Sequence, residues 1–152
     1  MKKPKGSKQV EAPAVPPLLL RQVELNDAAH GALKLLFCSF DAEVWNEGRC
    51  GVRLFELVDV AAGGDESAPA AAALTVDIDP ETVELRHYVV NPGLPTRFVT
   101  GRLICGIADR LRAAGAGSLL VAAPDDIERI GELWTTGFRK SLAEGEWLEL
   151  SL

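Results

Sequence analysis

The sequence predicts an α/β (α+β) fold, built on a mixed, mainly antiparallel sheet flanked by helices on both faces. Three consecutive strand-like runs, separated by turn residues, precede residue 91. Two helical patterns then alternate with a short apolar run, and a final pair of strand-like runs ends the chain. Strands joined by turns predict an antiparallel meander, whereas a strand, helix and strand in succession predict a parallel pair joined by a right-handed crossover.

Length and composition indicate one domain with a separate N-terminal segment. The chain has 152 residues, the usual size of a single domain. Residues 1–17 are rich in lysine, proline and alanine, so we expect a disordered tail before one domain over residues 18–152. The tail lacks the apolar core of a signal peptide, and no apolar run is long enough to cross a bilayer. We therefore expect a cytoplasmic protein without a membrane partner.

Net charge limits the classes of partner, and cysteine content bears on disulfides and metal sites. The net charge of −6 argues against nucleic acid, because phosphate binding needs a basic surface. An acidic body instead suits a cationic small molecule. The three cysteines, Cys38, Cys50 and Cys105, are scattered and form no CxxC pair. We expect buried, reduced thiols, with neither a disulfide nor a metal site.

The first part of the domain predicts a strand and a helical region. Residues 18–23 form a short strand, and Asn26 and Asp27 follow it as helix caps. Apolar side chains recur at helical spacing over residues 28–40, which predicts a helix. A second short helix is expected within residues 41–49.

An antiparallel meander follows this helical region. Its strand-like runs cover residues 51–60, 71–78 and 83–90, separated by a loop at 62–67 and a turn at 79–82. Alanines make the second run weak by intrinsic propensity, yet its place between two turns predicts a strand. The three runs give three consecutive antiparallel strands.

The last part of the chain alternates helices with strands. Residues 101–114 form a helix with apolar side chains at helical spacing, and Gly115 closes it. A nearly continuous apolar run at 118–123 predicts a buried strand parallel to the strand at 83–90.

A second helix and a hairpin complete the domain. Pro124 and Asp125 open the helix, and Gly137 ends it with a positive φ before Phe138 enters the core. The side chains expected to point inward from this helix are Ile127, Ile130, Leu133 and Trp134. The closing hairpin is formed by residues 138–142 and 146–152.

Three short motifs stand out in the second half of the chain. Val90-Asn91-Pro92 ends a strand, residues 97–102 read Arg-Phe-Val-Thr-Gly-Arg, and Gly137-Phe138 follows the last helix. In this order and spacing, the motifs resemble the cofactor-binding half of the GCN5-related N-acetyltransferase (GNAT) family. The resemblance extends over residues 18–152 and is strongest from residue 85 onward.

The resemblance implies a GNAT-like domain and an activity. It implies that an acetyl or other acyl group passes from acetyl-CoA, or another acyl-CoA, to a primary amine by direct attack on the thioester. The coenzyme would enter a V-shaped gap between the two parallel strands. The implied acceptor is a cationic small-molecule or peptide amine, and the resemblance also allows a homodimer.

The first motif matches the V-x-P pattern at the end of the family's fourth strand. A strand that diverges from its neighbour leaves backbone amides unpaired, and these can hold the thioester carbonyl and the pantetheine amides. The resemblance therefore places Tyr88 and Val90 at the cofactor. From the residues alone, the pattern merely ends a strand.

The second motif corresponds to the family's Arg/Gln-x-x-Gly-x-Gly/Ala loop, whose amides bind the pyrophosphate at a helix N-terminus. Arg97 occupies the Arg/Gln position, whereas Thr100 and Arg102 replace the two small residues and Gly101 lies between them. The resemblance implies phosphate binding by Arg97, Thr100, Gly101 and Arg102. The same residues also fit a capped helix with solvent-facing arginines.

The reaction needs an acid and a base, and the usual position of the acid holds a residue that cannot donate a proton. Leu133 stands where family members carry a tyrosine that protonates the departing thiolate, and it cannot act as an acid. Trp134 beside it is expected in the core or in the wall of a pocket.

Glu84 is the first candidate for the base, because some family members carry a glutamate there. His87 is the second, because its ordinary pKa of about 6.5 suits a base. Glu84 also fits a solvated strand face with a cross-strand partner.

Two functions remain open. The preserved order of elements and the V-x-P edge favour an active acyl-CoA-dependent N-acyltransferase. The altered loop and the missing tyrosine favour a catalytically inactive GNAT-fold binding or regulatory module that retains coenzyme A. Other chemistries lack their motifs, since the chain has no Gly-x-Ser-x-Gly elbow, HExxH sequence or P-loop.

Overall fold

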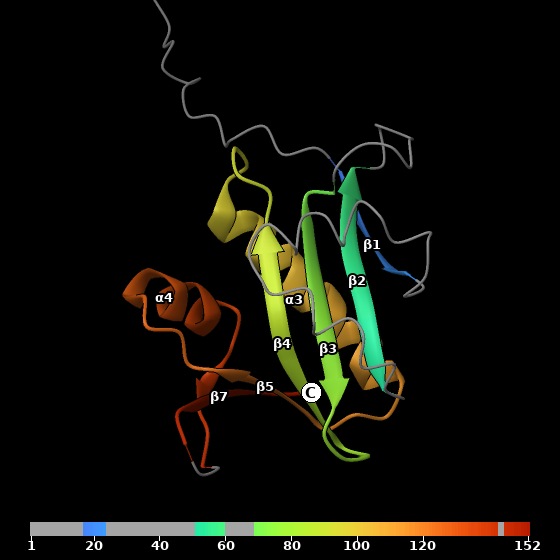
Figure 1. Ribbon diagram of the computed structural model, residues 1–152, viewed down its shortest axis with the longest axis vertical. Coiled ribbons are helices and arrows are strands. Elements are labelled where there is room, and N and C mark those ends of the chain that lie inside the picture. Colours follow the sequence, from blue (N-terminus) through green and yellow to red (C-terminus); the bar gives the residue numbers. More distant parts are fainter. Residues whose placement is uncertain (1–16, 24–50, 60–68, 143–144) are drawn as a thin grey trace, which may run out of the picture.

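The computed structural model describes residues 17–23, 51–59, 69–142 and 145–152. In this part of the chain, seven strands form one sheet accompanied by two helices (Figure 1). The elements in chain order are β1 (Leu18–Val23), β2 (Val52–Asp59), β3 (Ala71–Asp77), β4 (Thr82–Val90), α3 (Thr96–Ala113), β5 (Ser118–Ala122), α4 (Ile127–Thr135), β6 (Arg139–Lys140) and β7 (Trp147–Ser151). The strand order across the sheet is β1-β2-β3-β4-β5-β7-β6. Neither described helix has the length and apolar character needed to cross a bilayer.

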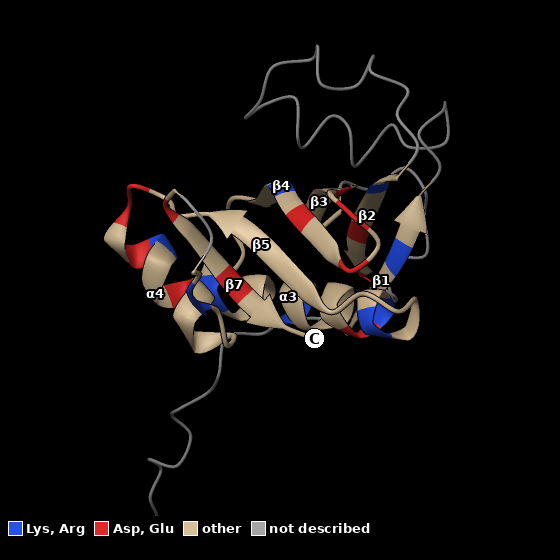
Figure 2. Cartoon of the chain, turned by 90° about the horizontal axis from the view of Figure 1, so that it is seen from below, with Lys and Arg blue, Asp and Glu red and all other residues tan. Residues whose placement is uncertain are grey.

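The sheet is mixed and mainly antiparallel, as the sequence predicted. β1 to β4 pair antiparallel in succession, β4 and β5 run parallel, and β7 pairs antiparallel with both β5 and β6. α3 connects the two parallel strands and covers one face of the sheet (Figure 2). Residues 1–16 of the predicted tail, the helices expected at 28–40 and within 41–49, and the loop at 62–67 lie outside the described residues.

The core lies between the sheet and α3. The apolar side chains that α3 contributes are those predicted from its spacing, and all are buried: Leu103, Ile104, Ile107, Ala108 and Leu111. β3 faces the core with small side chains, including Ala71 and Ala73, which allows α3 to pack close to the sheet. Full burial of each leucine or isoleucine contributes roughly 1.5–3 kcal/mol. This packing fixes α3 relative to β4, the strand that carries the candidate site.

A β-bulge interrupts the pairing of β3 with β4. Leu74 pairs with His87, but Thr75 pairs with Leu85, so Arg86 is an extra residue of β4. An extra residue shifts the alternation of side chains by one position. Leu85 and Tyr88 consequently belong to the same buried cluster, although a regular strand would place them on opposite faces.

α3 begins at Thr96, earlier than the predicted start at residue 101. Pro95 is the N-cap, with φ −67° and ψ 103°, and the Val99 N–H donates to the Pro95 carbonyl at 3.0 Å. Proline provides the φ of a helix start and loses no helical hydrogen bond there. The prediction was wrong because valine and threonine have modest helix propensity, whereas the burial of Val99 and Thr100 favours an earlier start.

α4 differs from its prediction in its start and in its buried face. Asp126 caps the helix, later than predicted, and its carboxylate accepts the Glu128 N–H at 2.9 Å. Leu133 is fully buried as expected, but Ile127 is 82% exposed and Trp134 is 46% exposed. The prediction that these two side chains point inward was wrong, because this short helix contacts the core along one narrow side only.

The end of α4 follows the prediction. Gly137 has a φ of +111°, and Phe138 is fully buried, so both expectations are confirmed.

Cys105 of α3 is a free thiol but is exposed, so its predicted burial was wrong. Cys38 and Cys50 lie outside the described residues.

Candidate functional site

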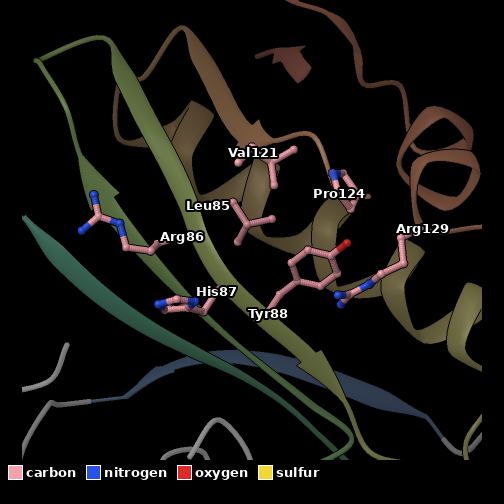
Figure 3. Close-up of a pocket in the computed structure, with 8 residues that line it drawn as sticks. Leu85, Arg86, His87, Tyr88, Val121, Pro124 and Arg129 are labelled. Atoms are coloured by element: carbon pink, nitrogen blue, oxygen red, sulfur yellow. The ribbon is translucent and has the colours of Figure 1, made fainter. Parts of the chain in front are cut away.

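The candidate site is a gap between the parallel strands β4 and β5. The two strands pair only at their first residues, and the pairs are Thr82 with Ser118, Val83 with Leu119, and Glu84 with Leu120. From residue 85 onward, β4 has no strand partner on this side within the described sheet. A pocket of about 130 Å³ opens where the strands separate (Figure 3). Its lining includes Leu85, His87, Tyr88, Val121, Pro124 and Arg129.

Tyr88 and Arg129 form one wall of this pocket. The Tyr88 side chain points from β4 toward α4, which lies across the gap (Figures 1 and 3). Tyr88 is 7% exposed, and its hydroxyl makes no hydrogen bond of good geometry to any described residue. The Arg129 guanidinium carbon lies 4.7 Å from the centroid of the Tyr88 ring, in a cation–π contact. A buried hydroxyl and an exposed cation therefore meet in one pocket.

The electrostatic surroundings act on Tyr88 in opposite directions. Burial raises the pKa of the Tyr88 hydroxyl above its ordinary value of 10.0. The positive charge of Arg129 opposes this shift, and the negative charge of Glu132 adds to it. Because burial has the largest effect, Tyr88 carries its proton at neutral pH.

Glu84, Arg86 and His87 lie on the other face of β4. Arg86 and His87 point away from Tyr88 and Arg129 (Figure 3). An Arg86 Nη2 donates to Glu84 Oε1 at 2.8 Å, and the Glu84 side chain is 13% exposed. Burial lowers the pKa of the His87 imidazole below its ordinary value of 6.5, the Arg86 charge lowers it further, and the Glu84 carboxylate opposes both effects. His87 is therefore neutral at pH 7, whereas Glu84 is held in an ion pair.

The loop after β4 leads to the exposed N-terminus of α3. The Asn91 N–H donates to the Ala70 carbonyl at 2.8 Å, which ties the end of β4 to the start of β3. Gly93 then adopts a φ of +97°. Pro95 makes no side-chain cap and the first turn of α3 contains no acidic residue. The N–H groups of residues 96–98 precede the first intrahelical bond. They give this end of the helix a positive electrostatic character.

Of the four predicted phosphate-binding residues, the structure places only Arg97 at this helix start, where it is exposed. Thr100 is 1% exposed and faces the core. Gly101 lies inside the helix, because α3 starts at Thr96. Arg102 donates from Nη2 to the Leu18 carbonyl of β1 at 3.2 Å. Thr100, Gly101 and Arg102 are thus parts of the helix and its packing.

The remaining predicted residues occupy distinct places. Val90 is half-buried at the end of β4 and packs against the core. Leu133 is fully buried and apolar. Trp134 stacks under Arg139, whose guanidinium carbon lies 4.7 Å from the ring centroid. Trp134 also lines a second pocket of about 310 Å³ between α4 and β7, which fits its expected place in a pocket wall.

Arg129 was not among the residues predicted at this site. Its contact with Tyr88 depends on how α4 lies across the gap, and no motif in the sequence marks it. No group of three or more His, Cys, Asp and Glu side chains in the described part of the chain is arranged to hold a metal ion.

Comparisons of the sequence give no relatives. No family model matches the chain, and no curated protein matches it.

Comparison with solved structures, in contrast, finds acetyltransferases of similar fold. An acetyltransferase from Bacillus subtilis, solved in complex with CoA, superposes with a TM-score of 0.69 at 16% identity, covering 90% of this chain and 99% of its own. A GNAT family acetyltransferase from Elizabethkingia anophelis with acetyl-CoA bound gives 0.69 at 12% identity, covering 89% and 98%. The ribosomal-protein-S18-alanine N-acetyltransferase from Escherichia coli gives 0.68 at 15% identity, covering 89% and 94%. The chain therefore has the fold of the GNAT superfamily.

Proposed function

We propose that this protein is an acyl-CoA-dependent N-acyltransferase, which passes an acetyl or other acyl group to a primary amine by direct attack of the amine on the thioester. The observation that carries the proposal is the separation of β4 from β5 after Glu84, with a pocket at the point of separation. The similar proteins from Bacillus subtilis and Elizabethkingia anophelis were solved with CoA and acetyl-CoA, which supports a CoA thioester as the cosubstrate here.

The residues at the gap fit the reacting end of such a cosubstrate. The pocket of about 130 Å³ has room for a thioester but not for a whole coenzyme. The β4 edge from Tyr88 to Val90 has no strand partner on this side in the described sheet and offers backbone groups to the acyl carbonyl and to pantetheine. The buried Tyr88 hydroxyl also makes no hydrogen bond of good geometry within the described structure, so the pocket contains a polar group that a ligand can satisfy.

The phosphates of the cosubstrate would bind at the start of α3. The amides of residues 96–98 and the exposed Arg97 side chain supply donors there. Arg102, Thr100 and Gly101 are left out of this proposal, because the helix begins before them. The altered glycine pattern of the loop therefore does not by itself remove the phosphate site.

His87 is the proposed base. An amine must lose a proton to attack or to complete the transfer, and an unprotonated imidazole accepts that proton at neutral pH. The lowered pKa of His87 keeps its imidazole in this form. Glu84 ranks second, because its carboxylate is already paired with Arg86.

The proposed acceptor is a cationic small-molecule or peptide amine. The overall charge of −6 favours the approach of a cation. A homodimer and a cytoplasmic location stay predictions.

A catalytically inactive binding module is the second candidate function. Leu133 is buried and apolar at the position of the family's tyrosine, so this helix supplies no acid there. Such a module would still bind CoA in the gap but would not transfer the acyl group.

A thermal-shift experiment followed by a transfer assay tests both candidates. Acetyl-CoA at about 100 times its Kd adds about 2.7 kcal/mol to the free energy of unfolding, which raises Tm by about 5 °C or more. Longer acyl-CoAs are compared in the same way, and release of free CoA is then measured with a panel of amines. Binding with transfer supports the enzyme, and binding without transfer to any amine supports the module. Absence of binding to every acyl-CoA contradicts both functions and leaves only the fold.

A further inference from the structure

We infer that the Tyr88 hydroxyl is the acid that protonates the departing thiolate, with the Arg129 guanidinium as its neighbouring charge. This inference rests on the proposed function and adds a catalytic residue to it. It assigns the role to a strand residue, because Leu133, on the last helix, has no proton to give.

The state of the Tyr88 hydroxyl supports this assignment. Tyr88 is 7% exposed, and its oxygen makes no hydrogen bond of good geometry in the described structure, although the Arg129 side chain lies close enough to interact with it. A buried hydroxyl without a partner lowers stability, since it loses its bonds to water. Phenylalanine would fill the same space without that loss. The hydroxyl lines a pocket rather than the closed core, so a bound group can supply the missing partner.

The position of Tyr88 relative to the proposed base also supports the assignment. Successive side chains of a strand point to opposite faces, and Figure 3 shows His87 and Tyr88 pointing apart. Both residues line the pocket where β4 leaves β5. A group held in this gap therefore has a base on one face and an acid on the other.

The transfer balances in atoms and electrons with Tyr88 as the acid and His87 as the base. The lone pair of the amine forms the new C–N bond, the C–S bond breaks, and the sulfur keeps the bonding electrons. Tyr88 gives its proton to that sulfur, and His87 takes the proton that the amine loses. Water returns a proton to Tyr88 and removes one from His87. No oxidant, reductant or further reactant is needed.

The charge of Arg129 favours proton transfer from Tyr88. Burial keeps Tyr88 protonated at neutral pH, so a proton is available. Arg129 lies over the ring at 4.7 Å and opposes the effect of burial, because a cation stabilises the phenolate that remains after proton transfer. Arg129 is exposed and sits in the first turn of α4, so it supplies this charge from the rim of the pocket.

The experiment compares wild type with Tyr88→Phe, which keeps the ring and its contact with Arg129. Turnover should fall about 100-fold, the usual contribution of an acid, while the Kd for acetyl-CoA measured by calorimetry stays within about twofold. The thiol of bound CoA gives a readout besides turnover. Its thiolate absorbance should appear at lower pH in wild type than in Tyr88→Phe, because the hydroxyl stabilises the thiolate.

The Tm of Tyr88→Phe distinguishes a catalytic role of Tyr88 from a purely structural one. Tm of Tyr88→Phe without ligand should equal or exceed that of wild type, because the lost hydroxyl makes no hydrogen bond of good geometry in the described structure. A purely structural tyrosine would instead give a lower Tm. Arg129→Gln should lower turnover by a smaller factor, and Arg112→Gln is the matched control, because Arg112 lies at the far end of α3 and pairs with Asp109.

Different results would contradict the inference about Tyr88 and the proposed function. If wild type transfers acyl groups and Tyr88→Phe transfers them equally well, the inference about Tyr88 is wrong and the proposed function stands. If Tyr88→Phe loses turnover together with Tm, the tyrosine is structural and the inference is also wrong. If wild type neither binds nor transfers, the proposed function is wrong and the inference fails with it.

Discussion

His87 and Tyr88 follow each other in β4 and point to opposite faces of the sheet (Figure 3). The bulge at Arg86 sets this arrangement, because it places Tyr88 on the buried face with Leu85. In a regular strand, Tyr88 would share a face with Arg86 and not with Leu85. A single irregularity in one strand thus directs the proposed acid toward α4 and the proposed base away from it.

The pH dependence of the reaction should follow the imidazole of His87. Burial lowers the pKa of His87 below 6.5, and only the neutral imidazole accepts a proton. We expect kcat/KM to be constant at neutral pH and to fall as the pH drops through this lowered pKa. In His87→Gln, turnover should fall by about 100-fold and this acidic limb should disappear. A pH–rate profile of both proteins measures the effect.

Glu84→Gln is the matched comparison for the base. Glutamine keeps the length of the side chain and removes the charge of the ion pair with Arg86. If His87 is the base, Glu84→Gln should retain the acidic limb and shift it to lower pH, because the Glu84 carboxylate raises the pKa of His87. Loss of the limb in Glu84→Gln, with the limb retained in His87→Gln, would assign the base to Glu84 instead.

Arg97→Ala should weaken acetyl-CoA binding about tenfold at low salt, with a smaller effect at high salt. A charge-assisted hydrogen bond to phosphate contributes about 1.5 kcal/mol or more, and salt screens an exposed pair. Arg97 is exposed in the first turn of α3, where the free amides lie. Calorimetry at two salt concentrations measures the change, and Arg112→Ala serves as a distant control on the same helix. Unchanged affinity in Arg97→Ala would exclude this helix start from the binding site.

The sequence predicts the strands better than it predicts the site. Alternating residues and turn signals locate the meander, and the left-handed Gly137 is predicted from its place after a helix. The bulge at Arg86 is not predictable, because it is defined by the pairing of β4 with β3. Arg129 is missed for a similar reason, since its partner Tyr88 comes from a distant strand. Local periodicity predicts single helices and strands but does not predict the contacts between them.

Gly137→Ala should lower the free energy of unfolding by about 1–3 kcal/mol. Gly137 has a φ of +111°, which residues with a β-carbon adopt at a cost of this size. An added Cβ would also lie 3.0 Å from the Leu150 Cδ1. Gly131→Ala is the control, because Gly131 is exposed inside α4 and an added Cβ would meet nothing within 4 Å. That variant should gain up to about 1 kcal/mol from helix propensity. Equal effects of the two substitutions in urea unfolding would contradict the assigned backbone conformation.

Arg102→Met should destabilise the fold and leave acetyl-CoA binding unchanged. The Arg102 Nη2 donates to the Leu18 carbonyl at 3.2 Å, and the Arg110 Nη2 donates to the Leu20 carbonyl at 2.8 Å. Both carbonyls belong to β1, the edge strand that pairs only with β2 in the described sheet. The two arginines therefore attach the edge of the sheet to α3.

Methionine keeps most of the apolar length of the arginine side chain, so Arg102→Met isolates the lost hydrogen bond. The loss should be about 1 kcal/mol in the free energy of unfolding, since the arginine is exposed to solvent. Arg110→Met should cost at least as much, because its bond is shorter. Urea unfolding measures both losses, and calorimetry checks that the Kd for acetyl-CoA does not change. If Arg102→Met instead weakens acetyl-CoA binding without loss of stability, Arg102 belongs to the phosphate site, and α3 must bind its ligand one turn later than its free amides indicate.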